Sequence, residues 1–475
     1  MTLSALKDIP LLGQAEFRDA VLAAVGRKAR VASFFGAPIG GRTRIFAVLA
    51  HPEEGSLGVL SCDAGESFPS LTPDCPQVHL FERELAEDCG VRLKGHPWLK
   101  PVRSHRTATN FYALAGSEVH EVAVGPVHAG IIEPGHFRFQ CHGETVYHLE
   151  IMLGYQHRGI EKTLKGPGPR TLRLMETAAG DSSIAHASAY CQVVEALARG
   201  HAPARAVVLR GVALELERLA NHVGDLGALA GDVGFLPTAS YCGRLRGDLL
   251  NLTAAACGSR FGRGWLRPGG VDFDLEEDLA DQCLEKLDAA LRDAGGAVEL
   301  LWSSPSVIAR FEETGPVSRK AAQELGLVGV AARACGIPRD ARYEFPSGIF
   351  RMVQIPVSVW KTGDVFARAY VRWLEIQRSG AFLEEQLPAL PPGPLAVGLR
   401  PAASDSLAVS LVEGWRGEVC HVAITDALGK FLKYKVTDPS FHNWMGLGLA
   451  LRGTPISDFP LCNKSFNLSY CGFDL

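Results

Sequence analysis

A series of amphipathic segments in the middle of the chain sets the tightest limit on the fold. Between residues 154 and 294, apolar side chains recur at three- and four-residue spacing, which predicts helices that each bury one stripe. The segments read GYQHRGIEKTLK, DSSIAHASAYCQVVEALAR, ARAVVLRGVALELERLANHVGDLGALA, SYCGRLRGDLLNLTAAAC and VDFDLEEDLADQCLEKLDAALRDA. We therefore expect this region to be mainly helical.

Shorter strand patterns lie on both sides of the helical region. Residues 137–151 alternate around a His-Gly turn, which predicts a β-hairpin. LAVSLVEGWRGEVCHVAITD and KFLKYKVTD predict a small antiparallel sheet, followed by a last helix over 442–451. The five prolines between 386 and 402 predict a crossover or linker.

The first 110 residues have a different pattern. A helical stretch over 15–30 leads into the strand-like runs VASFFGAPIG, RIFAVLA and LGVLSC, and the amphipathic LFERELAEDC ends at Gly90. The predicted fold class is therefore α+β. We expect a small N-terminal α/β domain over 1–110 and a large, mainly helical domain over 120–475 with short antiparallel sheets.

Composition and charge exclude several classes of function. Lys plus Arg is 48 against 52 for Asp plus Glu, which leaves no electrostatic signature for nucleic acid and no polybasic patch. We find no uncharged apolar run of 18 residues and no basic-then-apolar export signal at the N-terminus. The 12 cysteines are therefore expected to be reduced thiols, and none forms a C-x-x-C pair of the kind that holds a metal cluster.

A histidine and an acid stand out near the predicted hairpin. His128 lies in the Gly/Pro-rich loop GPVHAGIIEPGHF, where an imidazole could meet a ligand carbonyl and donate a proton near neutral pH. The alternative is a surface histidine without a role. Glu161 lies in HRGIEK at the start of a helix, either as a proton-handling carboxylate or as a charge that favours the helix dipole.

The loop ETAAGDSSIAH offers small side chains beside a helix start. Asp181 or Ser182 could cap the helix, and the small residues could leave room for a ligand. Asp232 follows a long helix, where it could poise a histidine or simply cap a turn. We find no Walker A loop, G-x-G-x-x-G, H-E-x-x-H or G-x-S-x-G motif, so the sequence gives no support for a bound nucleotide.

These blocks carry a family resemblance. From about residue 124 the chain resembles the large subunit of group 4 [NiFe] hydrogenases and the homologous quinone-site subunit of respiratory complex I. The matching blocks are GPVHAGIIEPGHF, HRGIEK, AHASAYCQVVE, ELERLANHVGDLGALAGDVGF, RPGGV and DPSFHNWMGLGLALRG. The first 110 residues, through FPSLTPDCPQVHLFERELAEDCGVRLKGHP, resemble the small complex I companion subunit that formate-hydrogenlyase-type proteins fuse to the large one.

The chain departs from the hydrogenase pattern at the metal ligands. The motif E-x-x-C-G-x-C-x-x-A-H has Ala179 and Ser182 in place of its cysteines, and the second cysteine pair falls at about Ser469 and Gly472. Cys471 is one residue out of register. Alanine has no donor atom and serine is a poor ligand for soft metals, so we expect no Ni–Fe centre and no metal site in this chain.

The resemblance also assigns roles to individual residues. His128 aligns with the quinone-site histidine of complex I and would donate a proton to a reduced acceptor. Asp232 aligns with the acid that poises it, and Glu161, with Arg158, would relay charge toward the membrane arm. The ligand cavity would be lined by Gly180, Asp181, Ser182 and His186, with Gly180 where the complex I pattern has a tyrosine.

The resemblance implies an oxidoreductase subunit. We expect a peripheral subunit on the cytoplasmic face of the cell membrane, beside a small subunit with a [4Fe–4S] cluster and membrane-embedded complex I-like subunits. We expect no tightly bound cofactor in this chain and a quinone-like electron acceptor. The alternatives are a redox-inactive subunit that couples the peripheral arm to the membrane subunits and a true [NiFe] hydrogenase.

Overall fold

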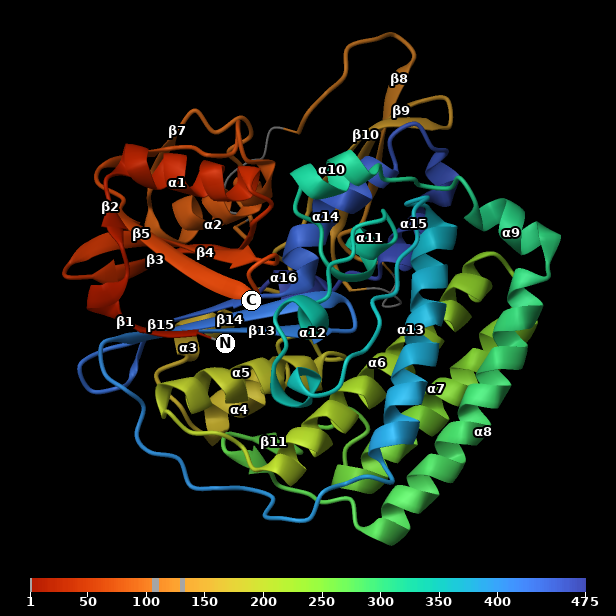
Figure 1. Ribbon diagram of the computed structural model, residues 1–475. Helices are drawn as coiled ribbons and strands as arrows, with labels where there is room; N and C mark the ends of the chain where they lie inside the picture. The colour runs from red at the N-terminus through yellow and green to blue at the C-terminus, as the bar shows by residue number, and fades with distance from the viewer. Residues whose placement is uncertain (1, 105–110, 129–132) are drawn as a thin grey trace.

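The structure is a computed structural model that describes residues 2–104, 111–128 and 133–475 (Figure 1). Two β-sheets lie face to face beside a group of long helices. Apolar side chains of one sheet, including Phe35 and Phe46, share a core with Leu407, Leu411 and Val422 of the other. The fold is α+β, as predicted.

The N-terminal sheet contains the strands predicted there. Its three long strands, over 30–39, 42–51 and 56–63, are antiparallel. A short edge strand over 11–12 runs parallel to the strand over 56–63. Two helices cover the face turned away from the second sheet, and the second of them ends at Gly90 with a φ of 67°, as the sequence indicated. In sheet order the strands are β2 (Leu11–Leu12), β5 (Ser56–Asp63), β4 (Arg42–His51) and β3 (Arg30–Ile39), with helices α1 (Gln14–Gly26) and α2 (His79–Cys89) and the parallel pair β6 (Ser67–Pro69) and β7 (Arg92–Lys94).

The central sheet unites the two ends of the chain. Three C-terminal strands form the predicted antiparallel meander, and the first strand of the chain adds to its edge by pairing with β13. The first residues therefore lie in the sheet of the C-terminal part, although the sequence pattern grouped them with the N-terminal unit. The strands in order are β1 (Thr2–Ala5), β13 (Ser406–Gly414), β14 (Gly417–Thr425) and β15 (Phe431–Thr437).

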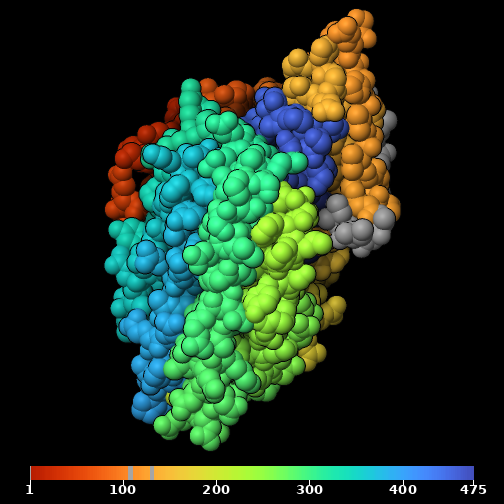
Figure 2. All heavy atoms as spheres, turned by 90° about the vertical axis from the view of Figure 1, so that its right-hand side faces the viewer, coloured from red at the N-terminus to blue at the C-terminus, as the bar shows by residue number. Residues whose placement is uncertain are grey.

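The predicted hairpin is part of a third sheet, which projects from one end of the molecule (Figure 2). Its strands are β8 (Val119–Val124), β9 (His136–His142) and β10 (Thr145–Met152), and β8 was not expected from the sequence.

One long helix covers the other face of the central sheet, and further long helices form the right-hand side of Figure 1. Helix α5 packs on β13 and β14, and α6 packs between α7 and α13, as expected for helices with wide apolar faces. The long helices are α5 (Ser183–Leu197), α6 (Ala204–Asp232), α7 (Leu236–Cys257), α8 (Glu277–Trp302) and α13 (Val365–Gln386). In the described part of the chain, no helix combines the length and apolar character needed to cross a membrane.

Short elements complete the chain. The helix expected over 442–451 starts earlier, at Pro439, because Asp438 caps it, and it is not the last, since α15 and α16 follow. The short elements are α3 (Ile160–Thr163), α4 (Pro169–Met175), α9 (Pro305–Phe311), α10 (Arg319–Glu324), α11 (Gly329–Arg333), α12 (Ala341–Glu344), α14 (Pro439–Ala450), α15 (Phe459–Phe466), α16 (Tyr470–Phe473), strands β11 (Leu266–Arg267) and β12 (Gly270–Val271), and 3₁₀ turns at Leu6–Asp8, Pro76–Val78, Gly348–Arg351 and Ile456–Asp458.

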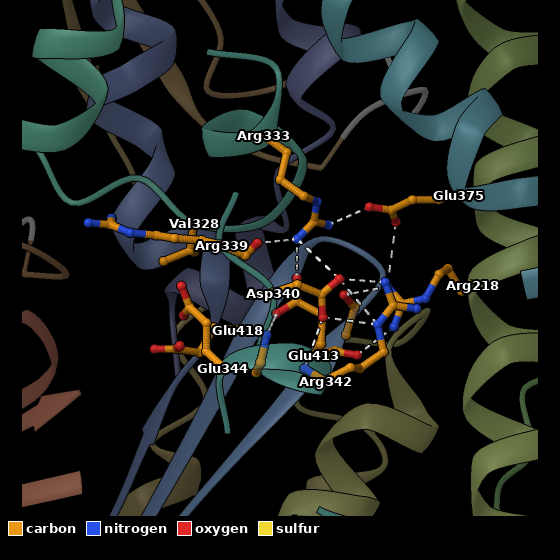
Figure 3. Close-up of polar contacts among 12 residues, drawn as sticks. Arg218, Val328, Arg333, Arg339, Asp340, Arg342, Glu344, Glu375, Glu413 and Glu418 are labelled. Carbon is orange, nitrogen blue, oxygen red and sulfur yellow. Dashed lines mark hydrogen bonds and ion pairs between the residues drawn. The ribbon is translucent and has the colours of Figure 1, made fainter. Parts of the chain in front are cut away.

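A buried ionic network joins these elements (Figure 3). At its centre, Arg333 pairs with Glu375 of α13 at 2.6 Å and with Glu413 of β13 at 2.7 Å. Glu375 also accepts a hydrogen bond from His222 of α6 at 2.7 Å. All four side chains are at most 2% exposed, so each charge depends on its partner for stabilisation.

The network continues to Arg342, which pairs with Asp340 at 2.6 Å and with Glu215 of α6 at 3.1 Å. A separate buried ion pair joins Arg30 of the N-terminal sheet to Glu418 of β14. The network ties the central sheet to the long helices, and the separate pair ties the two sheets together.

Candidate functional site

The candidate site lies where the loop before α5 meets the C-terminal segment. Ser182 occupies the cap position of α5, but neither it nor Asp181 caps the helix with its side chain. Instead, Glu217 of α6 accepts hydrogen bonds from the backbone N–H groups of Ile184 at 2.7 Å and Ala185 at 3.2 Å. Burial raises the pKa of Glu217 to about 8, so this carboxyl keeps its proton at neutral pH.

Arg416, in the turn between β13 and β14, ties the loop to the C-terminal segment. Its guanidinium donates to both carboxylate oxygens of Asp181, at 2.5 and 2.8 Å, and to Ser182 Oγ at 3.2 Å. Its Nε donates to the carbonyl of Asn467 at 2.6 Å. Burial would raise the pKa of Asp181, but the Arg416 charge outweighs it and lowers that pKa. The expected capping residue is therefore half of an ion pair.

The four positions that carry cysteines in the hydrogenase pattern make other contacts. Ala179 is fully buried, and Ser182 is bound by Arg416. Ser469 Oγ accepts from the N–H of Gly472 at 2.9 Å and so starts α16. A Cβ at Gly472 would lie 2.7 Å from Cγ of Asp438, so the carboxylate fills the space that a cysteine there would need.

Cys471 is the thiol nearest to these positions. Burial raises the pKa of the Cys471 thiol, although a hydrogen bond with the backbone of Gly180 partly offsets this effect. Ser469 Oγ lies 3.3 Å from the sulfur. Among the residues that the structure describes, no group of three or more His, Cys, Asp or Glu side chains is placed to hold a metal ion. The donors present here do not fit a Ni–Fe centre, because serine oxygen and one neutral thiol do not replace four thiolates.

His186, predicted to line the cavity, lies behind this loop in a chain of polar side chains. Its Nε2 is 3.1 Å from Oδ2 of Asp438, and its Nδ1 is 3.0 Å from Nε2 of His421. His421 Nδ1 is in turn 2.8 Å from the Tyr434 hydroxyl. The structure therefore brings together Gly180, Asp181, Ser182 and His186 around the former ligand positions.

His128 and Asp232 are not joined to each other. His128 Nε2 is 2.8 Å from the carbonyl of Gly135, and its ring lies 6.0 Å from that of Phe137. Residues 129–132 of the same loop lie outside the described residues. Asp232 is exposed at the end of α6, and within the described ranges no hydrogen bond or ion pair links it to His128. Their predicted partnership stays a prediction.

Glu161 and Arg158 make separate contacts. Glu161 is buried beneath β15, where its oxygens lie 3.0 Å from Lys435 Nζ and 3.3 Å from Lys433 Nζ. Burial alone would raise its pKa, but these lysines lower it to about 2, so the carboxylate is ionised at neutral pH. Arg158 is exposed and donates to the carbonyls of Thr177 and Ala178 at 2.8 and 2.9 Å, which braces the loop.

A large cavity lies elsewhere. It measures about 1010 Å³ and lies between the tip of the β4–β5 hairpin, α5, α6 and residues 341–352. Its lining includes Gln192, Arg342 and Glu413 but none of the predicted site residues. Met175 and Phe466 are side chains that could fill a headgroup-sized space between the His128 and Gly180 loops. Both are buried in the main core.

Sequence reasoning missed Arg416, His421, Tyr434 and Asp438 as site residues. A signal for one of them was present, because His421 interrupts the apolar run of VCHVAI in a strand whose residues are all buried. Arg416 meets Asp181, and Asp438 meets His186, across more than 200 residues of sequence, so no local pattern could have shown these two contacts.

Comparison with known proteins gives consistent matches. Residues 232–406 match the family model described as the 49 kDa subunit of respiratory-chain NADH dehydrogenase. The chain is 31% identical over 352 residues to the carbon monoxide-induced hydrogenase of Rhodospirillum rubrum, covering 73% of this chain and 97% of that protein. It is 29% identical to formate hydrogenlyase subunit 5 of Escherichia coli, covering 85% and 76%, and 30% identical to NADH-quinone oxidoreductase subunit 4 of Thermus thermophilus, covering 72% and 90%.

Proposed function

The chain belongs to the family of group 4 hydrogenase and complex I large subunits, and from this premise we propose that it forms a proton-coupled acceptor site in a complex I-like oxidoreductase. Members of this family are subunits of membrane-associated redox complexes, and this chain is a subunit of that type. The proposed partners are an iron–sulfur small subunit, which supplies electrons, and membrane-embedded subunits. The proposed location is the cytoplasmic face, as a peripheral subunit.

One observation carries the proposal. The loop that contains Gly180 and the C-terminal segment that contains Gly472 are held together by Arg416, as a functional site would require, although the metal-binding residues are gone. Preserving this closed, hydrogen-bonded geometry without thiolates favours an organic acceptor of the quinone class over a metal centre. In this proposal the chain itself holds no Ni–Fe group and no other tightly bound cofactor.

The site residues have distinct proposed tasks. His128 donates a proton to the reduced acceptor and Asp232 poises it. Gly180, where the complex I pattern has a tyrosine, leaves the acceptor without that anchor. Arg158 positions the loop through its two backbone contacts. Glu161 remains a proposed charge relay, although its ionised state and lysine partners favour a fixed ion pair that supports β15.

The test is acceptor reduction by the native complex. With the iron–sulfur centres reduced, the wild-type complex should reduce short-chain quinones, and His128→Ala should slow this by about 10²-fold, the usual contribution of a positioned acid. Asp232→Asn should slow it less. The matched controls are His142→Ala, on the exposed hairpin, and Asp248→Asn, on the surface of α7, which should match wild type. Unchanged rates in both site variants would refute the assigned roles.

A structural role is the second candidate. It is favoured by the burial of Met175 and Phe466, because side chains packed there would take the space of an acceptor headgroup. It is also favoured by the ion pairs through which Lys435 joins Glu161 to Glu84 of α2. If so, the complex would retain ion transport coupled to a neighbouring subunit while no variant of this site altered electron transfer. A true hydrogenase would instead contain nickel in stoichiometric amount, which metal analysis of the purified complex would reveal.

A further inference from the structure

Four buried side chains form a continuous hydrogen-bonded chain that ends beside a former metal-ligand position. Asp438, at the start of α14, lies against Gly472, and the chain runs from it through His186 of α5 and His421 of β14 to Tyr434 of β15. Its three links measure 3.1, 3.0 and 2.8 Å, and each member is at most 1% exposed. We refer to these residues as the imidazole chain.

The hydrogen-bond requirements of the imidazole chain allow two complete arrangements. In the first, His186 is neutral: its Nε2–H donates to Asp438, and its Nδ1 accepts from the Nε2–H of His421. The remaining nitrogen of His421 then accepts from the Tyr434 hydroxyl. In this arrangement every proton points toward Asp438 and every ring nitrogen has a partner.

The second arrangement holds one more proton. His186 is then a cation that donates from both nitrogens, to Asp438 and to His421, and His421 donates from Nδ1 to the Tyr434 oxygen. The two arrangements interconvert when one proton enters at Tyr434, the hydroxyl proton passes to His421 Nδ1, and the His421 Nε2 proton passes to His186. No side chain has to move.

We propose that the imidazole chain is a proton conduit that delivers protons from Tyr434 to the acceptor site at Asp438. The inference rests on the proposed function, because it assigns the path of the protons that acceptor reduction consumes. Reduction of one quinone takes up two electrons, from the partner's iron–sulfur cluster, and two protons, so the imidazole chain operates twice for each quinol formed. Each proton leaves His186 from Nε2 through Asp438, which leaves both imidazoles protonated at Nδ1. Both rings then return to their Nε2–H tautomers, which restores the first arrangement before the next proton enters.

The surroundings support this direction of transfer. Burial and the neighbouring His186 hold the pKa of His421 well below its usual value, so an added proton does not stay on His421. Burial would raise the pKa of Asp438, but the His186 hydrogen bond and the Arg416 charge lower it, so an anion lies at the end facing the site. A purely packing role would not require a histidine at position 421, since the adjacent residues of β14 are apolar.

The main test measures turnover of the native complex with a short-chain quinone. Tyr434→Phe keeps the ring but removes the hydroxyl through which protons enter, and His421→Gln keeps a polar side chain that cannot pass a proton. Both should lower the turnover rate at least about tenfold and increase its solvent deuterium isotope effect, with the KM for quinone unchanged. The matched control is Tyr190→Phe, a buried tyrosine of α5 that bonds to Gly168 outside the imidazole chain, and it should retain the wild-type rate and isotope effect.

A second measurement separates failure of the conduit from failure of the proposed function. In the full-length chain with ¹⁵N-labelled histidine, His421 should exchange between its two tautomers, and Tyr434→Phe should stop the exchange. A complex that reduces no quinone but shows this exchange would refute the proposed function and retain the conduit. A single fixed tautomer of His421, or wild-type rates in folded Tyr434→Phe and His421→Gln, would overturn the conduit.

Discussion

Strand β14 contributes to two buried polar regions of opposite character. Glu418 points toward the N-terminal sheet and pairs with Arg30 beside the ionic network, whereas His421, three residues later, faces α5 in the imidazole chain. Residues an odd number apart point to opposite faces of a strand, so one strand separates the two regions. The ionic network is built mainly from guanidinium–carboxylate pairs, and the imidazole chain joins groups that can exchange a proton.

The difference shows what each region can do. Guanidinium groups do not release their protons at any physiological pH, so the arginines around Arg333 fix the positions of elements and pass no proton. Imidazole accepts on one nitrogen and donates from the other, so the imidazole chain can pass a proton without breaking the fold. Removing a member should therefore affect mainly stability in the first region and mainly proton transfer in the second.

The largest effect on stability is expected from Arg333→Met. The variant leaves Glu375 and Glu413 buried without their shared cation, and breaking a buried pair in this way costs about 3–5 kcal/mol. Urea denaturation of the chain would measure the loss. Arg244→Met removes an exposed arginine that also pairs with two acids and should leave the midpoint nearly unchanged. Equal midpoints for the two variants would show that the buried network does not hold the elements together.

Glu217 belongs to neither region, since it caps α5 without an ion-pair partner among the described residues. Burial raises its folded pKa to about 8, above its unfolded value, so the folded protein binds the extra proton between these two values. Its contribution to stability is fully present below about pH 4 and is lost as the pH rises toward 8, by up to about 1.4 kcal/mol per unit.

Glu217→Gln should remove this slope. The free energy of unfolding, measured from pH 5 to pH 8 for both proteins, should fall less steeply in the variant. Parallel curves would mean that Glu217 is ionised in the folded protein and would remove the contrast with the ion-paired Asp181.

Gly472→Ala would break the imidazole chain at the end facing the site. The new Cβ would lie 2.7 Å from Cγ of Asp438, so the carboxylate must move away from His186, at a cost of about 1–3 kcal/mol. Gly243→Ala is the control, because its Cβ would meet nothing within 4 Å inside α7 and should stabilise the helix slightly. Thermal denaturation distinguishes the two, and an undisturbed Gly472→Ala protein would show that Asp438 is not held in place.

The smallest effect on stability is expected from Tyr434→Phe. It removes one neutral hydrogen bond to His421 and should cost about 1 kcal/mol, well below the loss in Arg333→Met. The measurement is urea denaturation under the same conditions. A loss as large as that of Arg333→Met would mean that the imidazole chain is a structural network like the ionic one.

The sequence predicted the elements that carry the site better than the contacts within it. The periodicity of α5 and α6 and the short strand-like runs of β13–β15 are local, so both could be read from the chain, as could the end of α2 at Gly90. The family pattern indicated that the former metal ligands should lie together, and the loop around Gly180 does meet the C-terminal segment through Arg416. The pairing of β1 with β13 had no local signal, because a four-residue edge strand gains its partner only from the fold.

The sequence by itself determined that this chain has a helical core, belongs to a redox family and lacks that family's thiolate ligands. Only the tertiary structure decided which groups lie around the positions that those ligands left. Asp438 fills the space beside Gly472, Glu217 takes over the capping of α5, and His186 and His421 meet across 235 residues of sequence. Helical and strand patterns depend on neighbours along the chain, whereas the protonation of a buried group depends on which distant side chains reach it.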